Sequence, residues 1–200
     1  MQDKRWLHMR MLLVPILVSI LICASCLRSV AQETATSLTN KPGPITYLAP
    51  TKDNYLKLAD EMETTLRRDV LGVWFPRTVD NESGGFYSNF TRDWQRTVSD
   101  GKFSVFQGRM TWMAAQIVMK RPDLKLQFLP VVSHGMDYLR NIMWDKKDGG
   151  FFWGLDDKGQ ITERYTDGKH LYGNSFGLYG AAAAYQATRD PKALELAKAC

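Results

Sequence analysis

The chain has 200 residues, of which 44% are hydrophobic and 24% are charged, and this composition excludes wholesale disorder. Its length fits one domain or one domain with an appendage. The net charge of +5 is partly an N-terminal effect, because residues 1–31 hold four basic residues and one acidic residue. A nearly neutral remainder has no excess of positive charge for binding nucleic acid, so we expect no nucleic-acid partner.

The N-terminus has the three-part pattern of an export signal. Three basic side chains lie within residues 1–10, residues 11–26 carry no charge, and Ser29-Val30-Ala31 is a small-x-small cleavage pattern. The uncharged run is shorter than the roughly 20 apolar residues of a membrane span. We therefore predict a signal peptide over 1–31, cleaved near Ala31, and a periplasmic or secreted protein. The alternatives are an uncleaved anchor and a lipoprotein attached at Cys26.

Residues 32–50 are polar with three prolines, which predicts a linker before a folded part over 51–200. We expect membrane contact only through the export signal. Once residues 1–31 are removed, Cys200 is the single remaining cysteine, so no intramolecular disulfide is possible. The sequence has no Cys/His cluster with zinc spacing and no cofactor motif, so we expect neither a metal nor a cofactor.

The first predicted element is a helix over 52–71, where apolar residues three or four apart form one stripe. Pro76 lies beyond its expected end. A loop follows, in which Phe86–Phe90 is predicted as a short strand. Four further helices are expected over 102–120, 123–143, 169–188 and 191–200. Pro130 is the weak point of the second of these, and Asp190 is the expected N-cap of the last.

An internal repeat is the most informative feature. The segment Asp80-x-x-x-Gly84-Gly85-Phe86 matches Asp145-x-x-x-Gly149-Gly150-Phe151. Further on, Asp-Gly-Lys at 100–102 matches Asp-Gly-Lys at 167–169, and Gln107 aligns with Asn174. A period of about 65 residues with a helical hairpin in each unit predicts an all-α protein of stacked hairpins. Small residues in the second helix of each unit suit close packing.

The two repeated aspartates admit two interpretations. Asp80 and Asp145 are a possible acid/base pair of a glycosidase. Their equivalent places in the repeat instead favour a turn-forming role, in which the carboxylate accepts nearby backbone N–H groups. The glycine pairs are expected to adopt backbone angles that other residues disfavour.

Two stretches of the chain resemble the N-acylglucosamine 2-epimerase family, which includes the cellobiose 2-epimerases. The first is Gly84-Gly85-Phe86 followed by Gln107-Gly-Arg109-Met-Thr-Trp112, and the second covers 143–151 and 169–179. The resemblance extends over about 52–200. It implies an (α/α)6 toroid, represented here by about two hairpins and the start of a third. It also implies an isomerase that acts at C2 of an aldose or N-acylhexosamine, with a small carbohydrate as substrate.

The resemblance places Arg109 in the active site and takes the proton-transfer histidines from later hairpins. Inverting or moving a centre beside a carbonyl needs a base and an acid, and histidine suits both roles. The enediolate formed between the two steps is negative, so a fixed guanidinium stabilises it. Neither His134 nor His170 matches the family's later histidine motifs. We therefore expect the chain to be an N-terminal portion of a longer catalytic domain.

Each candidate site residue also has a structural interpretation. Arg109 either faces the sugar or pairs with Asp100 or Asp145. Trp112 either packs in the core or stacks on a sugar ring. Tyr172 and Asn174 are candidates for binding sugar hydroxyls, and capping or inter-helix hydrogen bonding is the alternative. His134 and His170 are expected to be structural and solvated, respectively.

Two further functions remain open at this point. One is a six-hairpin glycoside hydrolase, and the other is a non-catalytic carbohydrate-binding fragment. The apolar faces of terminal hairpins also make a homodimer possible.

Overall fold

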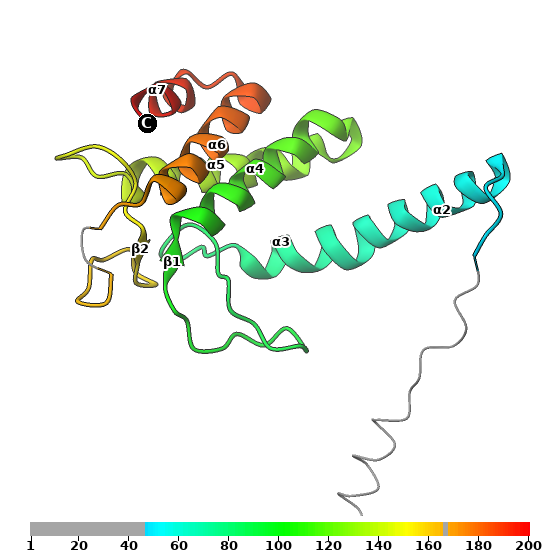
Figure 1. The fold of residues 1–200 in the computed structure, drawn as a ribbon, viewed down its shortest axis with the longest axis horizontal. Helices are drawn as coiled ribbons and strands as arrows, with labels where there is room; N and C mark the ends of the chain where they lie inside the picture. Colours follow the sequence, from blue (N-terminus) through cyan, green and yellow to red (C-terminus); the bar gives the residue numbers. More distant parts are fainter. Residues whose placement is uncertain (1–46, 166–167) are drawn as a thin grey trace, which may run out of the picture. The chain divides into compact units, whose positions relative to one another are not determined.

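The computed structural model describes residues 47–165 and 168–200. The predicted signal peptide and most of the predicted linker lie outside these ranges. The chain divides into two units, Met1–Leu56 and Lys57–Cys200, and the second contains every residue of the candidate site. Within it the structure is mostly helical (Figure 1). No helix in the described part of the chain is both long and apolar enough to cross a membrane.

The first helical segment is longer than predicted. It consists of α2 (Lys52–Thr65), a π-helical turn η1 (Leu66–Leu71) and α3 (Gly72–Thr78), which follow one another without a gap. The expectation that Pro76 lies beyond the helix is therefore wrong. Proline removes its own N–H from the helix and its ring crowds the carbonyl four residues earlier. Phe75 and Thr78, on either side of Pro76, are both buried, and this packing holds the last turn in place. The helix ends at Val79, which is extended.

The predicted apolar stripe of this helix forms but is not buried. Leu58 is 37% exposed and Met62 is 72% exposed, and in the described structure no residue of α2 is buried. Burial begins only at Leu71 and Phe75.

The strand predicted over Phe86–Phe90 does not form. Phe86 and Phe90 make only isolated bridges, with Val79 and Arg96 respectively. The backbone bonds of this segment go to different partners, since Tyr87 N–H donates to Thr78 and Phe86 N–H donates to a side chain. A ladder therefore cannot continue. The sheet that does form pairs β1 (Lys102–Phe103) with β2 (Gly154–Leu155) in antiparallel register, and it joins the loops of the two repeats.

The remaining helices follow the predicted order with shifted ends. They are α4 (Ser104–Lys120), the 3₁₀ turn η2 (Pro122–Leu124), α5 (Lys125–Tyr138), the π-helical η3 (Leu139–Met143), α6 (Leu171–Thr188) and α7 (Pro191–Ala199). Pro130 lies inside α5, which continues through it. The predicted cap of α7 is confirmed, because the Asp190 carboxylate accepts the N–H of Lys192.

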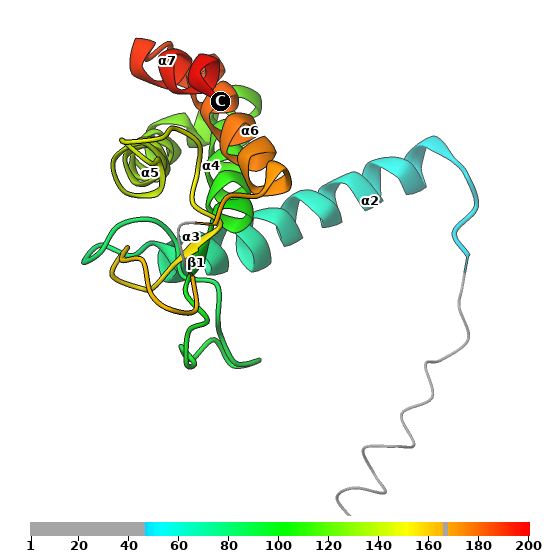
Figure 2. The same cartoon turned by 60° about the vertical axis from the view of Figure 1, so that its left-hand side comes forward.

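The helices α4 and α6, each the second helix of a repeat, pack against each other. The helix α5 packs on α4, and α7 packs on α6 (Figure 2). The small residues at the contact are necessary. A Cβ added to Gly108 would lie 2.1 Å from the backbone oxygen of Phe176, and one added to Gly180 would lie 2.9 Å from the oxygen of Gly108. Close approach of the two helix backbones is thus the role of these glycines, as the sequence predicted.

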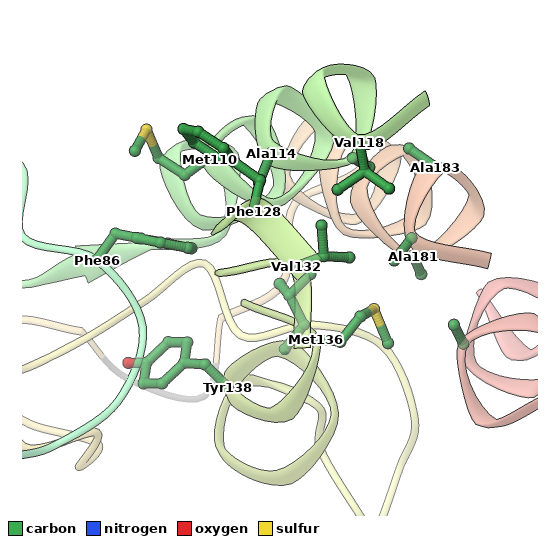
Figure 3. Close-up of a cluster of buried hydrophobic side chains, with 14 of the residues drawn as sticks. Phe86, Met110, Ala114, Val118, Phe128, Val132, Met136, Tyr138, Ala181 and Ala183 are labelled. Atoms are coloured by element: carbon green, nitrogen blue, oxygen red, sulfur yellow. The ribbon is translucent and has the colours of Figure 1, made fainter. Parts of the chain in front are cut away.

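The core is one cluster that includes α4, α5 and the first Gly-Gly-Phe loop and extends to α6 and α7 (Figure 3). Phe128, Val132 and Met136 project from α5, and each is at most 6% exposed. Tyr138 points from the same helix toward the loops, away from Ala181 on α6. The core therefore fastens the first repeat loop to the helices that carry the candidate site.

Candidate active site between two inner helices

An open pocket of about 540 Å³ lies between α4 and α6. A volume in this range suits a small ligand. Its lining consists of three residues from each helix: Arg109, Trp112 and Met113 from α4, and Ser175, Phe176 and Tyr179 from α6. The first and last residues of each set are four apart, about one helical turn, so each set occupies one face of its helix. The pocket combines a largely apolar, aromatic wall with one cation.

Arg109 has no carboxylate partner among the residues that the structure describes. Both aspartates predicted as ion-pair partners of Arg109 pair with other residues. Asp100 pairs with Arg164 at 3.1 Å, and Asp145 pairs with Lys169 at 2.5 Å. The guanidinium carbon instead lies 4.5 Å from the ring centre of Phe176, a cation–π contact. Its hydrogen-bond donors are left available to an anionic or hydroxyl-bearing ligand.

The aromatic wall is built by stacking across the two helices. The rings of Trp112 and Tyr179 are 5.0 Å apart and nearly parallel, at 19°. Phe176 meets Tyr179 edge-on at 6.2 Å. Trp112 is thus half-buried, with one face packed on Tyr179, and it also lines the pocket. Core packing and ligand contact are therefore compatible for this residue.

The other two predicted sugar-binding residues lie outside the pocket lining. Tyr172 is 58% exposed, and its ring meets Phe176 edge-on at 5.0 Å. The carboxamide of Asn174 is engaged by backbone: its oxygen accepts the N–H of Phe151 at 2.8 Å, and its nitrogen donates to His170 at 3.0 Å. Sugar binding by Tyr172 and Asn174 stays a prediction, while the structure shows a loop-fixing role for Asn174.

The same loop-fixing role belongs to Gln107, the repeat partner of Asn174. The oxygen of Gln107 accepts the N–H of Phe86 and its nitrogen donates to the carbonyl of Phe86, both at 2.8 Å. Because Gln107 lies on α4 two residues before Arg109, these bonds tie the first loop to the helix that holds the cation.

Asp80 forms the buried centre of the first loop. One carboxylate oxygen accepts the N–H groups of Glu82 and Ser83, and the other accepts the Lys102 ammonium at 2.5 Å. Burial alone raises the pKa of Asp80, but the hydrogen bond from Lys102 and those of the turn outweigh it and hold the pKa at about 2. The nearby phenol of Tyr87 has its pKa raised to about 12 by burial and by Asp80.

Asp145 repeats this arrangement in the second loop. It accepts the backbone N–H groups of Lys147 and Asp148, and the Lys169 ammonium donates to it. These bonds, the one from Lys169 foremost, lower the pKa of Asp145. The predicted turn-forming role of both aspartates is confirmed, as are the positive φ angles of the glycine pairs (70° to 79°).

Neither described histidine reaches the pocket lining. The Nε2–H of half-buried His134 donates to the carbonyl oxygen of Gly85 at 2.7 Å, which agrees with its predicted structural role. His170 precedes α6, is exposed, and lies 4.7 Å from the ring of Trp153.

The sequence missed four lining residues, namely Met113, Ser175, Phe176 and Tyr179. The helical spacing of Tyr172, Phe176 and Tyr179 is a signal that was available. Over the described ranges, no three His, Cys, Asp or Glu side chains are grouped so that they could hold a metal ion.

This geometry defines a class of protein. It consists of helical hairpins whose second helices, here α4 and α6, hold an arginine and an aromatic wall between them. The family model of N-acylglucosamine 2-epimerase matches residues 85–200. The chain therefore belongs to the N-acylglucosamine 2-epimerase family.

Relatives and solved structures extend this assignment. The chain is 30% identical over 139 residues to a cellobiose 2-epimerase of Bacteroides fragilis, which covers 68% of this chain and 34% of that protein. It is 29% identical over 133 residues to a cellobiose 2-epimerase of Eubacterium cellulosolvens, covering 66% and 31%. The chain thus spans about a third of the length of these relatives.

The fold agrees with the same group. A cellobiose 2-epimerase structure from Spirochaeta thermophila superposes with a TM-score of 0.63 at 28% identity, over 76% of this chain and 36% of that one. The corresponding structure from Bacillus thermoamylovorans gives a TM-score of 0.61 at 27% identity, over 72% and 35%. The predicted helical-hairpin fold is confirmed over about a third of these structures.

Proposed function

We propose that this chain supplies the sugar-binding wall and the anion-stabilising cation of a sugar 2-epimerase or isomerase with an (α/α)6 toroid. The substrate class is an aldose or N-acylhexosamine with a free reducing end. The observation that carries the proposal is Arg109, which lies at the open pocket without a carboxylate partner in the described structure and beside the Trp112–Tyr179 stack.

The chemistry assigns each part of the pocket a task. A base removes the C2 proton of the open-chain sugar, and the electron pair moves onto the carbonyl oxygen to form an enediolate. For epimerisation an acid then returns a proton to the opposite face of C2. For isomerisation the proton goes to C1, the O2 hydroxyl loses its proton as the carbonyl forms at C2, and O1 takes up a proton. Arg109 stabilises the negative oxygen where charge develops, because its guanidinium carries a permanent positive charge and several hydrogen-bond donors. The aromatic wall holds the apolar face of the sugar.

In this proposal, neither His134 nor His170 belongs to the proton-transfer pair. His134 is committed to the Gly85 carbonyl and His170 to the ring of Trp153. We assign the base and the acid to further hairpins of the toroid, in agreement with the family resemblance.

The glycoside hydrolase alternative is less well supported by the geometry. Its candidate carboxylates, Asp80 and Asp145, each accept two backbone N–H groups and a lysine ammonium. A carboxylate held ionised in this way cannot act as the general acid.

Binding of enediolate-like ligands tests the proposal on this chain itself. An aldonohydroxamate is a linear mimic of the enediolate that is anionic at mildly alkaline pH, where its weakly acidic N–OH group is ionised, and the alditol of the same sugar is its neutral counterpart. We expect the hydroxamate to bind at least about tenfold more tightly than the alditol, since complementarity to the charged intermediate is what the arginine supplies. Calorimetry or ligand-observed NMR measures both constants.

Arg109→Met should abolish this preference, while Arg140→Met, on η3 and outside the pocket, should retain it. Equal affinity of the wild-type chain for hydroxamate and alditol would favour the non-catalytic binding alternative. Tight binding of a closed-ring methyl glycoside alone would favour the hydrolase.

Export stays part of the proposal. The charged, apolar and small-residue segments of 1–31 support cleavage near Ala31. N-terminal sequencing of the mature protein distinguishes this from a lipid-modified Cys26 and from an uncleaved anchor.

A further inference from the structure

Arg109 reaches across the pocket to the aromatic ring of Phe176. Its guanidinium carbon lies 4.5 Å from the centre of that ring, within the range of a cation–π contact. The face of a phenyl ring is electron-rich and therefore attracts the cation. Because Arg109 is an exposed residue with a long side chain, a contact that limits the positions of its guanidinium bears directly on what this charge can do.

The two side chains start from a point where the backbones of α4 and α6 meet. Gly108 directly precedes Arg109, and a Cβ added to Gly108 would lie 2.1 Å from the carbonyl oxygen of Phe176. No side chain fits between the helices at this point. The close approach of the two backbones therefore places the base of the arginine beside the base of the ring, and both side chains line the pocket from there.

The rotation of α6 that turns Phe176 toward Arg109 is fixed by contacts with the second Gly-Gly-Phe loop. The Asn174 carboxamide accepts the N–H of Phe151, and a Cβ added to Gly177 would lie 2.2 Å from the Phe151 ring. These contacts lie two residues before Phe176 and one residue after it. The loop thus determines the direction in which the side chain of Phe176 leaves the helix.

Two further aromatic rings of α6 hold the ring of Phe176. The ring centre of Tyr172 lies 5.0 Å away at an interplanar angle of 73°, and that of Tyr179 lies 6.2 Å away at 86°. Nearly perpendicular contacts of this kind are favourable for aromatic pairs. With both neighbours in place, the ring has little freedom to turn and is a rigid support for the guanidinium.

We propose that Phe176 is the positioning residue for Arg109, and that its ring holds the guanidinium in the pocket before a sugar binds. The inference rests on the proposed function for the oxyanion that the guanidinium meets, while the contact itself is a property of the ligand-free chain. Phe176 acts through Arg109, since a phenyl ring has no hydrogen-bond donor to offer the oxygen. A side chain that is already held in place loses less conformational entropy when the ligand binds.

Nuclear magnetic resonance of the ligand-free chain tests the contact. The ring current of Phe176 should place the Nε–H signal of Arg109 upfield of an ordinary arginine signal, and Arg109→Met assigns that signal by removing it. Phe176→Leu should abolish the upfield shift, and Phe176→Tyr, which retains the ring, should keep it. The matched control is Phe152→Leu, which removes a ring 5.7 Å from the Lys169 ammonium and outside the pocket lining.

The preference for hydroxamate over alditol tests the effect of the contact. Phe176→Leu should reduce the ratio of the two affinities at least about threefold, whereas Phe176→Tyr and Phe152→Leu should keep it. The alditol and the hydroxamate lose the same apolar contact with the ring, so the ratio isolates the effect that passes through Arg109. Calorimetry at a pH where the hydroxamate is ionised gives the affinities, and circular dichroism verifies the fold of each variant.

An ordinary position of the Arg109 signal in the wild-type chain would overturn the positioning role. A hydroxamate preference that survives Phe176→Leu unchanged would overturn it as well and would leave the proposed function standing. Equal affinities of the wild-type chain for the two ligands would instead contradict the proposed function, and with it the oxyanion for which Arg109 is held.

Discussion

Two lysine–aspartate pairs of the same design differ in burial, and this difference sets their energetic weight. Lys102 donates to Asp80 and also to the carbonyl of Gly84, with both side chains almost fully buried. The pair Lys169–Asp145 is partly exposed. Removing one partner of a buried pair leaves an uncompensated charge, which costs about 3–5 kcal/mol, whereas exposed pairs contribute about 0–1 kcal/mol.

We therefore expect Lys102→Met to lower the free energy of unfolding by about 3–5 kcal/mol at pH 7 and Lys169→Met by about 1 kcal/mol. Urea titration followed by circular dichroism measures both free energies of unfolding.

The pH dependence of the free energy of unfolding adds a check. The folded-state pKa of Asp80 is about 2, below its usual value of 3.8, so its stabilisation is complete above about pH 4 and is lost as the pH falls toward 2.

The gap between wild type and Lys102→Met should consequently narrow between pH 4 and pH 2. A gap of constant size over this range would mean that lysine packing, and not the ion pair, provides the stability. Equal losses of unfolding free energy at pH 7 in Lys102→Met and Lys169→Met would contradict the assigned difference in burial.

At the scale of elements, contact between α4 and α6 determines whether the pocket exists, because each helix contributes half of its lining. Gly108 permits this contact, since any Cβ there meets backbone of α6 at 2.1 Å. Backbone atoms cannot rotate away as a side chain does, so the helices must separate to admit even one methyl group.

Gly108→Ala should therefore lower the free energy of unfolding by about 1–3 kcal/mol. Helix propensity alone predicts the opposite sign, a gain of about 0.5–1 kcal/mol. Gln186→Ala, at an exposed position of α6, should change stability by less than about 0.5 kcal/mol and is the control. Thermal and urea unfolding measure all three proteins, and a stabilised Gly108→Ala would refute the close packing of the two helices.

Helical periodicity and the repeat predicted the order of these elements, because both are local patterns. The β1–β2 ladder was not predictable in this way, since two-residue strands have no periodicity and their pairing joins residues about 50 positions apart. The continuation of α3 through Pro76 was missed because burial of Phe75 and Thr78, a tertiary effect, decides it.

The candidate site was predictable only in part for a related reason. The resemblance singled out Arg109 and Trp112, and both line the pocket. Phe176 and Tyr179 were missed because the face of α6 that meets α4 depends on helix rotation. The bonds that help to fix that rotation, from Asn174 to the second loop, are visible only in the structure.

At the scale of the whole molecule, the described part of the chain forms an open pocket between α4 and α6 and not a closed cavity. The pocket is open, the apolar stripe of α2 is exposed, and the matched part of the chain covers only 35% and 36% of the two solved structures. The proposed function therefore rests on this open surface.

The most direct measurement is the affinity of this chain for a reducing aldose, the substrate class proposed above, compared among aromatic variants. Trp112 and Tyr179 form the wall of the pocket, whereas Trp94 packs on Trp74, 5.1 Å away, outside the lining. Ligand-observed NMR, with circular dichroism to verify the fold, gives each dissociation constant.

If the pocket between α4 and α6 is the sugar site, Trp112→Ala and Tyr179→Ala should each weaken binding at least about tenfold, which corresponds to about 1.4 kcal/mol, while Trp94→Ala should leave it unchanged. Unaltered affinity in both pocket variants, or loss of binding in Trp94→Ala alone, would contradict the assignment of the site.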